Sequence, residues 1–278
     1  MEMPKNFLTE EEKKYPYAKF FEVPYENMNP ANPLYGITAK PMDPAKALTF
    51  DKKDLLLDPA YDADDMGYCV LPDGTGYVGM RMFYPNCTKE MFEWWFAWHG
   101  LESSRYKIWD PKSHYGVAVS RRSLAQRTDP KLNWKERNWD TSDFITAWTV
   151  NGVQTTRIAF VSPKEFGFDT ALMEKHQASA VCCFSSHPDE RMPVGPSTRV
   201  LHEVEGGLKV SLYFWYGFAV VDGKAIKPAD YRCPMSIPEL QVVHCAEEYQ
   251  HLGEILPAVY AENHLRVDKP EDFKTMPF

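Results

Sequence analysis

A succession of short apolar segments separated by hairpin turns constrains the fold of this chain more than any other feature. The dipeptide Asn151-Gly152 separates two such segments and can supply the positive φ angles of a two-residue type I′ hairpin. Turn residues also occur at Pro72–Gly76 and Glu205–Gly207. At least six strands joined in this way predict a mostly antiparallel sheet. The expected strands are Gly67–Leu71, Gly76–Tyr84, Phe144–Val150, Val153–Val161, Ala178–Phe184, Arg199–Val204 and Leu208–Val221.

Two segments have the pattern of helices. Thr88–Trp98 lacks turn residues, carries apolar side chains at helical spacing and stops before Gly100, a residue suited to follow a helix. A longer helix is expected over Leu240–Leu256, because Ser236–Glu239 fits a capping box, and Pro257 should end or kink it. Strands followed by one long late helix predict an α+β fold in which a curved sheet grips the helix, with a cavity between them.

Composition limits the classes of function. The 278 residues are 44% hydrophobic, which is enough to bury a large core, and residues 1–62, rich in Pro and charge, are expected to be an extension of the domain formed by 63–278. A net charge of −8 without a basic block argues against nucleic-acid binding. No secretory signal or membrane-spanning run occurs, and the six cysteines lack CxxC spacing. We therefore expect a cytoplasmic protein with reduced thiols that binds no membrane.

The late helix carries the strongest candidate for a metal site. His244 and Glu248 are four residues apart, which places both side chains on one helix face, where they can share a Zn²⁺ ion. The same spacing also occurs in solvated surface pairs. The apolar neighbours of His244 favour the metal, because a buried charge needs a partner.

A second candidate is His202, in the predicted strand Arg199–Val204. Two-residue alternation places Val200, His202 and Val204 on one face. A histidine on an apolar strand face beside a cavity can act as a general acid or base, although a hydrogen-bonded core histidine is more common. The chain has no GxSxG elbow, Gly-rich phosphate loop, GxGxxG or HExxH sequence, which disfavours a serine hydrolase or a dinucleotide enzyme.

Six blocks of sequence are distinctive: Leu8–Tyr17, Asp73–Tyr77, Met91–His99, Arg105–Trp109, His114–Tyr115 and Ser162–Gly167. Together they resemble the 2,4-diacetylphloroglucinol hydrolase and phloretin hydrolase family. The resemblance implies a Bet v 1-like helix-grip core with an N-terminal extension, a homodimer, and a zinc ion bound by two His and two Glu. The reaction it implies is hydrolysis of the carbon–carbon bond between an aromatic ring and an acyl carbonyl.

The resemblance assigns the metal ligands residue by residue. It makes His244 and Glu248 the late-helix pair and His114 the upstream ligand. The remaining glutamate should follow His114 by about thirty residues, yet the chain has no Glu between positions 136 and 165. Asp143 is the only carboxylate on the strand Asp143–Val150, where positions 143, 145 and 147 share a face by the two-residue period. It is the expected substitute for the missing ligand, although its side chain is one methylene shorter.

The resemblance also assigns the substrate contacts. Tyr106 is expected to contact a substrate hydroxyl, and His202 is expected to be the catalytic acid or base. Tyr213 or Tyr216, on the following strand, would contact another phenol.

The leading interpretation is a zinc-dependent hydrolase that cleaves the aryl–acyl bond of a polyhydroxylated aromatic ketone. Zinc lowers the pKa of bound water towards 7, or polarises a carbonyl. One alternative is a helix-grip binding protein for aromatic ligands that lost hydrolysis with the missing glutamate. Another is a metalloenzyme of the same fold that acts on a different bond.

Overall fold

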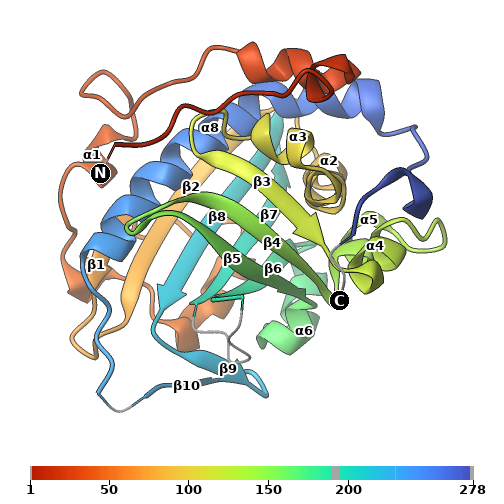
Figure 1. Ribbon diagram of the computed structural model, residues 1–278. Helices are drawn as coiled ribbons and strands as arrows, with labels where there is room; N and C mark the ends of the chain where they lie inside the picture. Colours follow the sequence, from red (N-terminus) through yellow and green to blue (C-terminus); the bar gives the residue numbers. More distant parts are fainter. Residues whose placement is uncertain (1, 189–194, 229, 276–278) are drawn as a thin grey trace.

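The computed structural model describes residues 2–188, 195–228 and 230–275. Within these ranges one antiparallel sheet has the strand order β1-β2-β8-β7-β6-β5-β4-β3 and curves around the long helix α8 (Figure 1). This is the Bet v 1-like helix-grip, α+β arrangement expected from the sequence. The strands are β1 (Gly67–Val70), β2 (Gly76–Pro85), β3 (His114–Val119), β4 (Thr141–Thr149), β5 (Gly152–Val161), β6 (Ser179–Ser186), β7 (Gly195–Val204) and β8 (Gly207–Tyr216), with a separate hairpin of β9 (Ala219–Val221) and β10 (Lys224–Ile226).

Helices pack on the sheet and close its ends. Short 3-10 helices, including Phe50–Leu57, make up much of the region before β1. The α-helices are α1 (Tyr35–Thr38), α2 (Lys89–Trp98), α3 (Ser103–Lys107), α4 (Arg121–Arg127), α5 (Trp134–Asn138), α6 (Pro163–Phe166), α7 (Thr170–Lys175) and α8 (Ser236–Asn263).

Both faces of the central strands are buried. In β8, Leu212 and Phe214 belong to the core that contains α8, whereas Tyr213 and Trp215 belong to a second core on the opposite face. The second core includes side chains of the 3-10 helix Phe50–Leu57. Because successive side chains of a strand point to opposite faces, β8 needs apolar residues at nearly every position. The N-terminal segment therefore covers the outer face of the sheet.

The β4–β5 hairpin is confirmed, but its turn differs from the predicted type. Val150 and Asn151 connect the paired residues Thr149 and Gly152. Gly152 adopts a φ of +88°, and Asn151 does not have a positive φ. Only the glycine is therefore left-handed, and it has no Cβ that would clash in this conformation. A type I′ turn requires a positive φ at both central residues, so the predicted turn type is wrong.

The helix α8 extends further than predicted in both directions. It begins at Ser236, so this residue lies inside the helix, and the residue before it, Met235, makes no side-chain cap. The predicted capping box is therefore wrong. Pro257 lies within the helix, which continues to Asn263 and buries Val259 after the proline. Packing of this last part against the core outweighs the backbone hydrogen bond that proline removes.

All six cysteines are buried and free, as expected for reduced thiols. Among the described residues, no helix combines the length and hydropathy that crossing a bilayer requires.

Candidate metal centre and substrate cavity

A cavity of about 340 Å³ lies between the inner face of the sheet and α8. This volume is within the range of small-molecule sites, about 300–1,000 Å³. Aromatic and aliphatic side chains make up about half of its lining residues, and most of the others are polar or charged. The aromatic residues of the wall include Phe96, Tyr106, Trp109, Trp148, Phe160, Phe214 and Tyr216.

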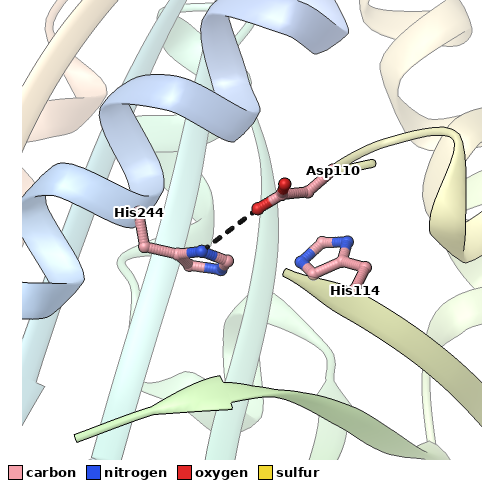
Figure 2. Close-up of side chains that lie close together, drawn as sticks. All are labelled: Asp110, His114 and His244. Atoms are coloured by element: carbon pink, nitrogen blue, oxygen red, sulfur yellow. Dashed lines mark ion pairs between the residues drawn. The ribbon is translucent and has the colours of Figure 1, made fainter. Parts of the chain in front are cut away.

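Two histidines and two carboxylates meet at this cavity: His114, His244 and Glu248 line it, and Asp110 lies beside His244 without lining it. Asp110, His114 and His244 each place one potential ligand atom within 4.8 Å of the others (Figure 2). Glu248 joins them, because its Oε2 lies 3.3 Å from Nε2 of His114 and 3.6 Å from Nε2 of His244. The structure thus brings together His114, His244 and Glu248, which were predicted from the sequence, and adds Asp110.

Three elements position these side chains. His244 and Glu248 project from successive turns of α8. His114 is the first residue of β3 and lies at a β-bulge, since it pairs with Ala147 while Gly116 pairs with Thr146. A bulge of this kind re-aims a side chain at a strand end.

Asp110 is held by a tight turn before β3. Its Oδ1 accepts hydrogen bonds from the backbone N–H of Lys112 at 3.0 Å and of Ser113 at 3.1 Å. Its Oδ2 lies 3.3 Å from Nδ1 of His244. Because the turn fixes one oxygen, the other is aimed at the imidazole.

Hydrogen bonding sets the orientation of the His114 ring. Nδ1 of His114 lies 3.2 Å from the carbonyl oxygen of Tyr106, which can only accept, so Nδ1 carries the hydrogen. In the neutral ring, Nε2 then presents a lone pair to the carboxylate of Glu248. The Tyr106 ring stacks on the imidazole with centroids 3.8 Å apart. Two acceptors that face each other in this way require a proton or a cation between them.

The cluster is electrostatically negative and buried. Asp110 and Glu248 are 1% and 4% exposed. Burial alone lowers the pKa of His244, but the charges of Glu248 and Asp110 outweigh burial and raise it to about 9. Burial opposes ionisation of Asp110, yet the hydrogen bond from His244 and the charge of His114 lower its pKa. The site therefore favours positive charge, and its imidazole and carboxylate donors suit a divalent ion such as zinc.

Comparison with known proteins decides the family. The family model described as the DAPG hydrolase PhiG domain matches residues 48–261. The chain belongs to the DAPG hydrolase family. It is 29% identical to a phloretin hydrolase of Eubacterium ramulus over 258 residues, which covers 91% of this chain and 92% of that protein. It is 30% identical to a 2,4-diacetylphloroglucinol hydrolase of Pseudomonas sp over 266 residues, which covers 89% and 88%.

Solved structures are more distant. The crystal structure of Ara h 8.0201 is 9% identical and has a TM-score of 0.42, covering 66% of this chain and 99% of that one.

In this member of the DAPG hydrolase family, Asp143 has another partner. Its Oδ1 accepts from Nη1 of Arg127 at 2.6 Å, and both side chains are buried. Asp143 lines the cavity together with Ile145 and Ala147, but it makes no ion pair or hydrogen bond with His114 or His244 among the described residues. The carboxylate beside the histidines is that of Asp110. The structure therefore corrects the expectation that Asp143 replaces the missing glutamate.

The Arg127–Asp143 ion pair lies so close to the backbone of residue 100 that only glycine fits there. A Cβ atom there would lie 2.0 Å from Nη1 of Arg127 and 2.5 Å from Oδ2 of Asp143. Gly100→Ala should displace the pair and lower the free energy of unfolding by about 1–3 kcal/mol. Gly36→Ala is the control, since a Cβ at Gly36 has nothing within 4 Å. Urea unfolding measures both, and equal stability of the two variants would contradict this account.

His202 and Tyr213 lie on the face of the sheet away from the cavity. Nε2 of His202 lies 2.9 Å from the carbonyl oxygen of Leu56. The Tyr213 hydroxyl donates to Asp65 at 2.9 Å and accepts from Arg81 at 2.7 Å. Neither residue lines the cavity. The expectation that they contact substrate there is therefore corrected, because alternation places them beneath the N-terminal segment.

Tyr106 and Tyr216 do line the cavity. Burial raises the pKa of both phenols, and the charge of Glu248 adds to the effect at Tyr106. Each hydroxyl therefore keeps its proton and can donate a hydrogen bond to a ligand.

We expect His202→Ala to affect stability rather than turnover. Removal of a general acid or base typically costs about 10²–10⁴-fold in rate. Since His202 contacts Leu56 on the outer face, kcat/KM for a cleaved ketone should change by less than about threefold, while the thermal midpoint falls. Steady-state kinetics and calorimetry measure the two effects. A hundredfold loss of kcat/KM with an unchanged midpoint would return His202 to a catalytic role.

Two residues at the site, Asp110 and Arg199, had no role assigned from the sequence. Asp110 directly follows the block Arg105–Trp109, but nothing local indicates its approach to His244, which is far away in the chain. Arg199 faces the cavity from β7, where alternation with Leu201 places it on the inner face.

Proposed function

We propose that this protein is a metal-dependent hydrolase that cleaves the aryl–acyl carbon–carbon bond of a polyhydroxylated aromatic ketone. The supporting observation is the cluster of Asp110, His114, His244 and Glu248, three of which line an aromatic cavity, in a member of the DAPG hydrolase family. The relatives' names, phloretin hydrolase and 2,4-diacetylphloroglucinol hydrolase, indicate the substrate class.

We propose that His114, His244 and Glu248 bind a zinc ion and that Asp110 orients His244. Glu248 faces Nε2 of His244, whereas Asp110 faces Nδ1 of the same ring. A carboxylate on the ring nitrogen opposite the metal is the common outer arrangement at zinc sites, and it fixes both tautomer and ring orientation. When bound, the ion lowers the pKa of a bound water and polarises a carbonyl.

The other cavity residues bind and shield the substrate. The aromatic walls accept a flat ring, and the buried position excludes bulk water from the acyl group. Tyr106 stacks on His114, so its hydroxyl is fixed relative to the cluster and can hold a ring hydroxyl. Overall, one water is consumed: its oxygen joins the acyl carbon as a carboxylic acid, and a proton replaces the acyl group on the ring.

Product analysis tests the proposed function. The zinc-loaded protein is incubated with phloretin and with a diacylphloroglucinol, and the products are identified by mass spectrometry. We expect the deacylated trihydroxybenzene ring and the free acid in equal amounts from phloretin. Recovery of both ketones unchanged, although they bind, would overturn the proposal and leave a binding protein.

The role of Asp110 has its own test. Asp110→Asn keeps a side chain that can form the turn but removes the charge that faces His244. Loss of an outer carboxylate typically weakens metal affinity by about 10–100-fold, and we expect that range here. Asp58→Asn is the control, because exposed Asp58 caps a similar turn, accepting from Ala60. Zinc titration against a chelator measures the affinities, and unchanged affinity in Asp110→Asn would contradict the assignment.

The oligomeric state and the cellular location stay predictions from the sequence. We propose the homodimer that the family resemblance implies, and a cytoplasmic location. Light scattering of the purified protein measures the oligomeric state, and a monomer at micromolar concentration would contradict the first of these.

A further inference from the structure

Arg199 is a buried cation in the cavity wall with only neutral partners. It is 7% exposed. Its Nε donates to the Tyr249 hydroxyl at 2.6 Å, and its Nη1 donates to Ser197 at 2.9 Å and to the thiol of Cys183 at 3.1 Å. Among the described residues, no carboxylate forms an ion pair with it, and its Nη2 has no hydrogen bond.

The other well-buried arginines of the described chain differ in this respect. Each has a carboxylate within hydrogen-bond distance, which compensates the cost of removing a guanidinium from water. These pairs are Arg81–Asp65, Arg105–Asp268 and Arg127–Asp143. Arg199 carries the same cost without a counter-charge, although its guanidinium remains ionised in any protein environment. An anion supplied by a ligand would complete this site.

The surroundings of Arg199 suit a bound aromatic anion. Its guanidinium carbon lies 4.8 Å from the centroid of the Phe214 ring, which holds the planar group against an apolar wall. The three neutral partners fix Nε and Nη1, so the remaining donors are available on the cavity side. A preorganised fork of donors in a water-poor cavity binds an anionic oxygen more strongly than a neutral one.

Arg199 is also separated from the metal cluster along the sheet. Arg199 lies on β7 and His114 on β3, with β6, β5 and β4 between them. Both line the same cavity. A single ligand in this cavity can therefore contact both the cluster and Arg199.

We propose that Arg199 binds an anionic oxygen of the substrate, so that the cavity selects aromatic ketones that carry a carboxylate or an ionised phenol. The aromatic-ketone part rests on the proposed function, whereas binding of the anion requires no hydrolysis. Arg199 is thus a specificity-determining residue.

Two matched pairs of ligands test this proposal and separate the two sources of the anion. The carboxylate pair is 4-acetylbenzoate and its methyl ester, and the phenol pair is 2,4,6-trihydroxyacetophenone and its trimethyl ether. Calorimetry on the zinc-loaded protein gives the dissociation constants. We expect the wild type to bind the anionic member of at least one pair about tenfold or more tightly than the neutral member. The pair that shows the preference identifies the anion.

Variants assign the preference to the side chain. Arg199→Met should remove it, Arg199→Lys should keep part of it, and Ser197→Ala, which loses a neutral partner only, should keep it. Equal binding within both wild-type pairs, or a preference unchanged in Arg199→Met, would overturn the proposal. If circular dichroism shows that Arg199→Met is unfolded, the proposal is tested by two other results. The wild type must prefer the anionic ligand, and Arg199→Lys must show a smaller preference. A preserved preference without ketone cleavage would instead contradict the hydrolase proposal alone.

Discussion

His244→Ala is expected to lose its bound zinc and at least about 1,000-fold in kcat/KM for an aryl ketone. The imidazole lies between Asp110 and Glu248, so its removal takes away one ligand and the contact through which Asp110 acts. A metal ion contributes several kcal/mol to the stabilisation of charge in a transition state, and each 1.36 kcal/mol is a factor of ten in rate. Metal analysis and product analysis of the same preparation measure both losses.

His264→Ala is the matched control for this experiment. His264 follows the last residue of α8 and hydrogen-bonds to Tyr260, away from the cavity. It should retain the metal content and activity of the wild type. Full zinc occupancy together with full activity in His244→Ala would contradict the proposed metal centre.

Arg127→Met is expected to cause the largest loss of stability, about 3–5 kcal/mol in the free energy of unfolding at neutral pH. The side chains of Arg127 and Asp143 are 0% and 1% exposed, so the substitution leaves an unpaired buried carboxylate. Replacing both residues, as in Arg127→Met with Asp143→Leu, should restore much of the loss, because an apolar pair carries no such charge. Urea unfolding of the two variants and the wild type measures the difference.

The loss in Arg127→Met should depend on pH. Burial already raises the pKa of Asp143 in the presence of Arg127, and removal of the guanidinium should raise it further. A raised pKa in the folded state means that the folded chain holds the proton at higher pH than the unfolded chain. Stability relative to the wild type is therefore greatest at low pH and falls as pH rises. A deficit that is the same at pH 4.5 and pH 7 would contradict the role given to Asp143.

The architecture was predictable because its signals are local. Two-residue alternation and turn residues identify β4 and β5, and an apolar run identifies most of α8. The conformation of the turn at Gly152 was not predictable, since one left-handed residue and two give the same hairpin. Nor was the extent of α8, because the packing of Val259 after Pro257 depends on the folded core.

Site residues could be predicted from the sequence only where they lie close together on one helix or strand. His244 and Glu248 follow from helical spacing. His202 and Tyr213 were assigned to the wrong face, because β7 and β8 are buried on both sides and alternation alone does not say which face borders the cavity. Asp110 meets His244 only through the tertiary fold.

The partner of Asp143 could not be predicted from the local sequence either. Alternation places it on one strand face with Ile145 and Ala147, which also line the cavity, but its partner Arg127 comes from a different element, α4. No feature of the strand sequence distinguishes a carboxylate that binds a metal from one that binds an arginine.

Anomalous diffraction at the zinc absorption edge, from crystals grown with zinc, tests the central claim most directly. We expect one strong peak within bonding distance of Nε2 of His114, Nε2 of His244 and the carboxylate of Glu248, with Asp110 beside the opposite nitrogen of His244. An active protein whose anomalous peak lies elsewhere, or that shows no peak among these side chains, would contradict it.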